Sequence, residues 1–364
     1  MTGKVQGTLA AIGLWCAPAG CQEDLPEARV SGAYVHIYRE EDARFCAGSL
    51  SYMDKQVVAV SEMFGLDPPQ IDFVWVPPDV VGNFCPPTGL ACYRYREDII
   101  ISPDVPQSHE LVHAIYGAHD IVPDDFIAEG MATLFSENLP WGEFTIEASI
   151  EDLLDHKDTR YNNLPGEYYG RAAHFTWFFL RRYGAEQLGL LTLRHLSGRP
   201  RAEQERVMLE VTGETLDEVL AAYREVPVCA NTQVRPALVE CGAPVVPWEE
   251  GPAQRWSAVA TIGCERADVL GPVTGIMWTT RSFEVEAAGT YQLTAPGAGL
   301  QAAQVVVGRC GSGCEDPFYQ TLPEGTSEVF DLEAGRYYAM LMRHVDDPGE
   351  IGLVVTRQPP GDSR

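Results

Sequence analysis

Three side chains in one short segment have the types and spacing of a catalytic metal site. His109 and His113 lie four residues apart in the segment HELVH, and Glu110 follows the first histidine. Because an α-helix has 3.6 residues per turn, side chains four residues apart share a face. On a helix the two imidazoles can therefore hold one zinc ion, and Glu110 can act as a general base toward a water there.

A catalytic zinc site needs a third protein ligand and one open position. The downstream segment PDDFIAEGMATLF begins at Pro123 with residues typical of a helix start, and it places Glu129 about one and a half turns inside that helix. A carboxylate on a second helix that faces the first completes the ligand set. We therefore expect one zinc ion per chain, bound by His109, His113 and Glu129.

HELVH followed by FIAEGMA resembles the gluzincin metallopeptidases, the group that contains thermolysin and the one-zinc aminopeptidases. In that group the glutamate of an E-G-x-A or similar segment is the third zinc ligand, which corresponds to Glu129. Two features depart from the group: the gap from His113 to Glu129 is slightly shorter than in well-known members, and Thr133 replaces an aspartate of thermolysin that orients a ligand. The resemblance spans about residues 34–228 and is specific only across 109–131.

His119 is a rival third ligand, because it lies six residues after His113, as in the metzincin pattern HExxHxxGxxH. That pattern requires a glycine at a sharp turn, where this chain has Tyr116, and Gly117 comes one residue late. No plausible Met-turn follows in the catalytic region. Glu129 is therefore the preferred ligand, and His119 is expected to be an exposed loop histidine.

Residues 168–184, YYGRAAHFTWFFLRRYG, resemble the gluzincin helix that follows the third ligand and carries a tyrosine facing the cleft. The segment starting at Tyr169 matches its Y-x-K-G-A pattern loosely. The resemblance implies that the Tyr169 phenol donates a hydrogen bond to the reaction oxyanion. The alternative is that Tyr168 and Tyr169 pack a helix end. His174 is a second candidate donor, although a lone histidine in an apolar helix is usually a core residue.

The predicted function follows from this site: hydrolysis of peptide bonds in a peptide or protein substrate by a metal-activated water, with Glu110 as the general base. Two alternatives remain open. One is a non-catalytic envelope lipoprotein that uses a peptidase-like fold as a binding module, although such a module has no need of Glu110. The other is a zinc hydrolase of peptidoglycan cross-links.

Periodicity and turn residues predict the elements that position the site. Residues 92–102, CYRYREDIIIS, directly precede the metal helix and read as one strand. In gluzincins an edge strand there pairs with an extended peptide; an ordinary core strand is the alternative. The other predicted elements are strands at 34–40 and 71–77, a helix at 50–64 ended by Gly65, helices near 105–117 and 124–137, and a helical region at about 145–225.

The composition changes after the helical region. Residues 229–253 are rich in proline and cysteine and read as a connector. Beyond them, SFEVEAAGTYQLTA and EVFDLEAGRYYAMLM are β-prone and split by glycine, which predicts an all-β sandwich or barrel. Their shared A-G-x-Y pattern suggests a repeated hairpin inside one sheet. The region resembles the β-sandwich domains, such as pre-peptidase C-terminal domains, that follow many secreted bacterial peptidases.

We therefore expect an α+β protein in two main parts. The first is a thermolysin-like, gluzincin catalytic unit at 34–228, with a mixed sheet and a helical subdomain at about 145–228. The second is a β-sandwich at 254–364. Because every candidate catalytic residue precedes the connector, residues 31–228 are expected to fold and stay active after truncation at about residue 240.

The N-terminus carries an export pattern, in which Lys4 and a short apolar run precede the small residues APAGC at 17–21. The A-P-A triplet fits ordinary signal peptidase. The A-G-C triplet resembles the end of a lipoprotein box, with proline in place of the usual aliphatic residue, and is preferred. We expect a signal peptide at 1–21, a linker at 22–33, and membrane contact only through a lipid anchor at Cys21.

Cysteine usage and charge agree with export. Eight cysteines remain beyond residue 21, and an even number in an exported chain predicts disulfides. The spacings of Cys85 with Cys92 and of Cys310 with Cys314 suit local loops; a structural zinc cluster is a weaker alternative. The net charge of -26 repels phosphate backbones, which argues against a nucleic-acid partner. It favours solubility or the attraction of basic substrates.

Overall fold

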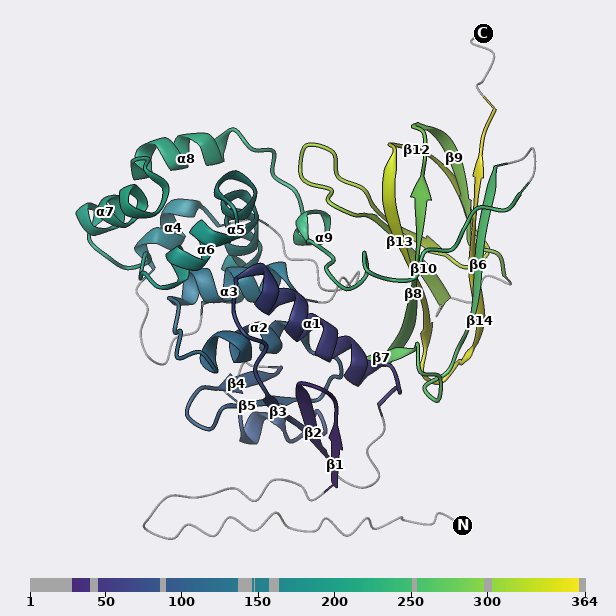
Figure 1. Cartoon of the computed structure of the whole chain (residues 1–364), viewed down its shortest axis with the longest axis horizontal. Helices are drawn as coiled ribbons and strands as arrows, with labels where there is room; N and C mark the ends of the chain where they lie inside the picture. The colour runs from purple at the N-terminus through teal and green to yellow at the C-terminus, as the bar shows by residue number, and fades with distance from the viewer. Residues whose placement is uncertain are drawn as a thin grey trace, which may run out of the picture.

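A computed structural model describes residues 28–39, 45–85, 90–136, 146, 148–156, 164–250, 254–297 and 303–359. The predicted signal peptide, with its candidate anchor Cys21, lies outside the described residues. Figure 1 shows helices packed on a small sheet on one side of the molecule and a two-sheet sandwich on the other. The expected α+β class is confirmed.

The small sheet is mixed and has the order β1-β2-β3-β5-β4. The inner strands β2, β3 and β5 run parallel, while β1 and β4 pair antiparallel at the two edges. β1 falls within the range expected as a linker. The strands are β1 (Ala28–Ser31), β2 (Val35–Arg39), β3 (Ile71–Trp75), β4 (Cys92–Arg94) and β5 (Ile99–Ser102).

The expected single strand at 92–102 is two strands. A turn interrupts it, in which Asp98 has a φ of 56°, a left-handed conformation that asparagine and aspartate tolerate better than most residues. The chain reverses there, so that β5 lies inside the sheet with all four residues buried, and β4 becomes the edge. The disulfide between Cys85 and Cys92 ties down the start of this edge strand.

The predicted helices agree with the structure to within a few residues, and the described part of the region at 145–225 contains five helices. None of the helices in the described residues is long and apolar enough to cross a membrane. The helices are α1 (Ser49–Met63), α2 (Ser108–Gly117), α3 (Asp125–Leu134), α4 (Ile150–Asp155), α5 (Tyr169–Tyr183), α6 (Ala185–Thr192), α7 (Arg201–Thr212), α8 (Leu216–Arg224) and α9 (Asn231–Val234), with 3-10 turns η1 (Val81–Asn83) and η2 (Gly166–Tyr168).

The expected C-terminal sandwich is also present. Its sheets have the orders β11-β10-β13-β8-β7 and β12-β9-β14-β6, and neighbouring strands in each sheet pair antiparallel. The strands are β6 (Arg255–Ile262), β7 (Leu270–Val273), β8 (Ile276–Val285), β9 (Gly289–Thr294), β10 (Ala303–Arg309), β11 (Tyr319–Pro323), β12 (Ser327–Leu332), β13 (Gly335–His344) and β14 (Gly349–Arg357).

The repeated A-G-x-Y segments do not form hairpins inside one sheet. Each joins the two sheets, one between β8 and β9 and the other between β12 and β13. The hydroxyl of Tyr291 donates to the carbonyl of Ala287 at 2.8 Å, and that of Tyr337 donates to the carbonyl of Glu333 at 3.1 Å. A tyrosine bonded back to the upstream backbone is a known device at the corners of β-sandwiches. The repeat is therefore a pair of equivalent corners.

The sandwich and the helices share one core. β13 has seven consecutive buried residues, which means that both of its faces are covered. One face contributes to the core between the two sheets. On the other face, Tyr338, Met340 and Met342 belong to the same buried cluster as the interior of α2, α3 and α5. The sandwich thus covers the helices through an apolar interface.

Three disulfides cross this interface. Cys46, before α1, pairs with Cys264 of the sandwich. Cys229 and Cys241 of the connector pair with Cys314 and Cys310. The local loop expected between Cys310 and Cys314 is therefore wrong, because each cysteine bonds to the connector instead. With Cys85–Cys92, the eight cysteines form four disulfides, which fits an exported protein.

A chain ended at residue 240 is expected to lose its cooperative fold, contrary to the sequence-based expectation of an independent unit. The truncation removes the strands that cover the helices and three of the four disulfides. Thermal unfolding followed by circular dichroism, beside the full chain, tests this. A sharp transition in the truncated chain would show that the helical part folds alone.

His174 lies buried where α5 meets the sandwich. Its Nδ1 accepts from the Tyr223 hydroxyl at 2.9 Å, and its Nε2 donates to the Pro227 carbonyl at 3.1 Å. The pKa of His174 is lowered to about 4, mainly by burial and also by nearby Arg171, whereas the Pro227 carbonyl and Glu315 oppose the change. His174 is therefore a neutral core residue.

This burial makes stability depend on pH. The unfolded imidazole has a pKa of about 6.5, so its contribution is complete above that pH. It falls by about 3 kcal/mol as the pH drops toward 4, because the unfolded chain binds the proton first. Urea unfolding across this range should show a steeper loss for the native chain than for His174→Gln. Parallel pH profiles for the two would contradict the assignment.

Candidate metal centre

Helix α2 carries His109 and His113 on one face and packs its other residues into the core. Leu111, Val112 and Ile115 are fully or almost fully buried. The helix ends at Gly117, as expected from the sequence. A Cβ at Gly117 would lie 2.1 Å from the hydroxyl of Tyr93 on β4, so a larger residue at the end of α2 would displace the Tyr93 side chain.

Helix α3 presents Glu129 to these histidines, and Asp124 fixes where the helix begins. One carboxylate oxygen of Asp124 accepts from the backbone N–H of Ile127 at 2.9 Å, which caps the helix. The other oxygen accepts from the N–H groups of Leu196 and Ser197 at 2.5 and 2.8 Å. Asp124 is fully buried, and burial raises its pKa despite these bonds. It anchors α3 to the segment before α7.

Gly130 allows α3 to cross α5 closely. A Cβ there would lie 2.4 Å from the Thr176 hydroxyl and 2.7 Å from the backbone carbonyl oxygen of Ala172. The hydroxyl could rotate away, but the backbone could not. The crossing brings the first turn of α5, with Tyr169, toward the histidines.

The three expected ligands meet at one point. Nε2 of His109 and Nε2 of His113 lie 3.1 and 3.6 Å from Oε2 of Glu129, and 3.4 Å from each other. Tetrahedral zinc with nitrogen and oxygen ligands at about 2.0–2.1 Å separates two ligand atoms by about 3.3 Å. The three donor atoms therefore have the spacing of three corners of a zinc tetrahedron, so these residues fit a zinc ion.

Electrostatics support the same arrangement. The side chains of His109, His113 and Glu129 are only 18%, 10% and 13% exposed. Burial by itself raises the pKa of Glu129, but the charges and hydrogen bonds of the two imidazoles outweigh it and hold this pKa well below its usual range. The carboxylate is therefore ionised, as a metal ligand must be.

Glu110 and Tyr169 border this cluster. Glu110 is 8% exposed, and its carboxylate makes no hydrogen bond to any residue that the structure describes. The Tyr169 ring stacks on His109 with centroids 6.0 Å apart, and its phenol hydrogen-bonds Glu129. Burial, together with the negative charges of Glu129 and Glu110, raises the pKa of Tyr169 well above its usual value. The phenol therefore stays a hydrogen-bond donor at neutral pH.

The rival residues lie elsewhere. His119 follows the end of α2, and its Nε2 donates to the carbonyl of Asp67 at 2.8 Å. Thr133, where thermolysin has an aspartate, has a buried hydroxyl with no hydrogen-bond partner in the described residues; it does not take over that aspartate's role. Asp124 and Gly130 were not identified as site residues from sequence, although the helix-start pattern and the E-G-M-A segment contain them.

A second group of candidate metal ligands contains His174, Cys229 and Cys314. The two sulfur atoms are bonded to each other. Since thiolates rather than disulfides bind zinc, this group does not form a metal site. The same reasoning excludes the structural zinc cluster considered for the eight cysteines, because all of them are paired.

No protein-family model and no curated protein matches this sequence. Among solved structures, the chain is similar to the pre-peptidase C-terminal domain of a collagenase from Bacillus anthracis, at 12% identity and TM-score 0.22, over 31% of this chain and 93% of that one. It is also similar to PliG from Aeromonas hydrophila, a periplasmic inhibitor of g-type lysozyme, at 13% identity and TM-score 0.21, over 32% and 98%. Likeness at this level carries no information about activity.

Gly130→Ala is expected to destabilise the chain by about 1–3 kcal/mol, because the added methyl group forces α3 and α5 apart. Urea unfolding measures this change. Gly82→Ala is the matched control, since a Cβ at Gly82 meets nothing within 4 Å. Equal stability of the two variants would contradict the close crossing.

Proposed function

We propose that this chain is a zinc-dependent peptidase, of a gluzincin-like type, that hydrolyses peptide bonds. The observation that carries the proposal is the triangle of donor atoms from His109, His113 and Glu129, with zinc-like spacing, beside the carboxylate of Glu110, which has no hydrogen-bond partner among the described residues. Two nitrogens and one oxygen with a fourth position open are the donor set of a catalytic zinc site.

The roles of the side chains follow from their contacts. A zinc ion held there supplies Lewis acidity, which activates water and polarises a carbonyl group. Within the described part of the chain the Glu110 carboxylate has no hydrogen bond to give up, so it can accept the proton of the attacking water and pass it to the leaving amine. Tyr169, held protonated by its surroundings, donates to the substrate oxygen as negative charge develops there.

This reading is preferred to a binding module because of Glu110. Its carboxylate is 8% exposed and has no hydrogen bond to a described residue, an arrangement that lowers the stability of the fold. A catalytic role explains why such a costly group stands there. The peptide class of substrate rests on the resemblance of HELVH and FIAEGMA to gluzincins. Peptidoglycan cross-links are also amide bonds, so the same chemistry extends to them, and the substrate screen separates the two.

The full chain is expected to bind about one zinc ion and to cleave peptides. Glu110→Gln should keep the zinc and abolish cleavage, because Glu110 is a base and not a ligand. His113→Ala should lose the zinc, while His119→Ala, which removes a histidine bonded elsewhere, should change neither property. Elemental analysis of purified protein and cleavage of a proteome-derived peptide library measure both.

Two further variants separate the remaining roles. Glu129→Ala should weaken zinc binding, because it removes a ligand oxygen. Tyr169→Phe should keep the zinc and lower turnover by about 10²–10³ if its phenol stabilises the oxyanion. Loss of zinc in His119→Ala but not in Glu129→Ala would reject the gluzincin-like ligand set. Zinc binding without cleavage of any peptide or peptidoglycan substrate would instead identify a binding module.

A further inference from the structure

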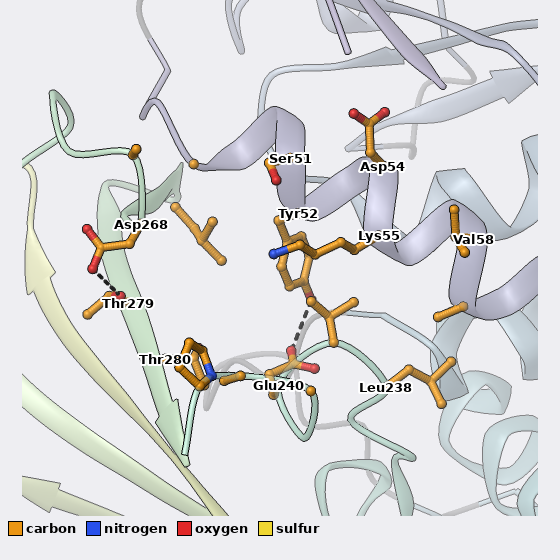
Figure 2. A pocket seen from close by; sticks show the side chains of 18 of the residues that line it. Ser51, Tyr52, Asp54, Lys55, Val58, Leu238, Glu240, Asp268, Thr279 and Thr280 are labelled. Carbon is orange, nitrogen blue, oxygen red and sulfur yellow. Dashed lines mark hydrogen bonds between the residues drawn. The ribbon is translucent and has the colours of Figure 1, made fainter. Parts of the chain in front are cut away.

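A cavity of about 590 Å³ lies away from the metal centre, between α1, the connector and the sandwich. Its volume is within the range of small-molecule sites, about 300–1,000 Å³. Figure 2 shows α1 along one side, with Lys55 projecting into the space, and Glu240 of the connector and Thr279 of β8 on the other sides. No ligand of the metal centre lines it.

Most charged groups around this cavity already have hydrogen-bond or ion-pair partners. Asp54 accepts from three backbone N–H groups, those of residues 33–35. Glu240 accepts from the Tyr52 hydroxyl and pairs with buried Arg235. Asp268 and Arg281 pair with each other at 2.6 Å. These groups fix the walls and leave little charge for a ligand.

Lys55 and Glu62 are the exceptions. Both line the cavity, and neither side chain has a hydrogen bond or ion pair with a residue that the structure describes. Lys55 is also the one lysine in the described residues, in a chain with 52 acidic side chains. An amine that stays unpaired in such an acidic protein is available for an external anion.

Glu62 is placed to attract a cation. It is the second-last residue of α1, and the last turn of this helix contains no basic residue. The helix dipole makes this end negative, so the carboxylate and the dipole repel each other. A bound cation would relieve that repulsion.

The two groups have a defined separation. They are seven residues apart, which places them on nearly the same face of α1 and about 10 Å apart along its axis. Val58 and Ala59, which lie between them on α1, also line the cavity, as do Leu238 and Val239 of the connector. The lining of the cavity therefore combines an amine, apolar side chains and a carboxylate.

We propose that this cavity binds a short peptide with free termini and an apolar central residue. Its α-carboxylate lies at Lys55 and its α-ammonium at Glu62. An extended peptide spans at most about 3.3–3.6 Å per residue, so a tripeptide matches the separation of about 10 Å. Products of the metal centre and peptides from other sources share these two termini, and the site does not require the proposed hydrolysis.

The test uses the full chain as Glu110→Gln and the tripeptide Ala-Leu-Ala in a calorimetric titration, with mass spectrometry to show that the peptide stays intact. Free Ala-Leu-Ala should bind with simple saturation. Amidating its C-terminus or acetylating its N-terminus should each weaken binding about three- to tenfold. Each change removes one ion pair, which contributes little when it is exposed and more when it is also a charge-assisted hydrogen bond.

Variants assign each end. In Lys55→Gln, amidation should have no further effect, while acetylation still weakens binding; in Glu62→Gln the pattern should be reversed. Glu186→Gln, which removes a carboxylate from α6 outside this cavity, should bind like the parent. Lys55 and Glu62 are exposed, so the variants should fold normally, which thermal unfolding checks.

Absence of saturable binding at millimolar peptide would overturn the proposal, as would affinities that ignore the termini or both substitutions. Repeating the titration with zinc removed separates this site from the metal centre. Peptide binding at this cavity together with a native chain that hydrolyses no peptide would refute only the proposed function. Hydrolysis by the native chain without this binding would refute only the second site.

Discussion

The cost of burying one carboxylate constrains the whole helical part. Glu129 lies between α2 and α3 with little exposure, and an ionised carboxylate is tolerated there only beside a positive partner or a metal. The imidazoles of His109 and His113 provide this environment, but only if the two helices keep their relative positions. The Asp124 anchor, the close crossing at Gly130 and the covering strand β13 all serve that requirement.

Local features could be predicted from the sequence, whereas features that join distant segments could not. The repeat of apolar residues along a segment predicted most helices and strands, because that repeat depends on which face of the segment itself is buried. The A-G-x-Y segments were predicted to be hairpins but are corners between the two sheets. The same sequence pattern occurs whether the next strand stays in its sheet or enters the other one. The local disulfide between Cys85 and Cys92 is confirmed. The local loop at Cys310 and Cys314 is wrong, because the partners of these two cysteines depend on where the connector lies.

The candidate site follows the same division. His109, Glu110 and His113 are linked by one turn of helix, so their geometry is contained in their spacing. Glu129 required a second helix facing the first, which the resemblance to gluzincins implied and the structure places within 3.1 Å of His109. The anchoring role of Asp124 could not be predicted, because its partners Leu196 and Ser197 lie more than 70 residues away and no sequence pattern connects them to α3.

The disulfide between Cys46 and Cys264 spans 218 residues, and this has a consequence for timing. A chain emerges from the ribosome N-terminus first, so the metal helices are made long before the strands that cover them. The cross-links that complete the interface also form only in an oxidising compartment. A chain built in this order completes the shared core of its helices and sandwich only after the last strands are made and the disulfides have formed.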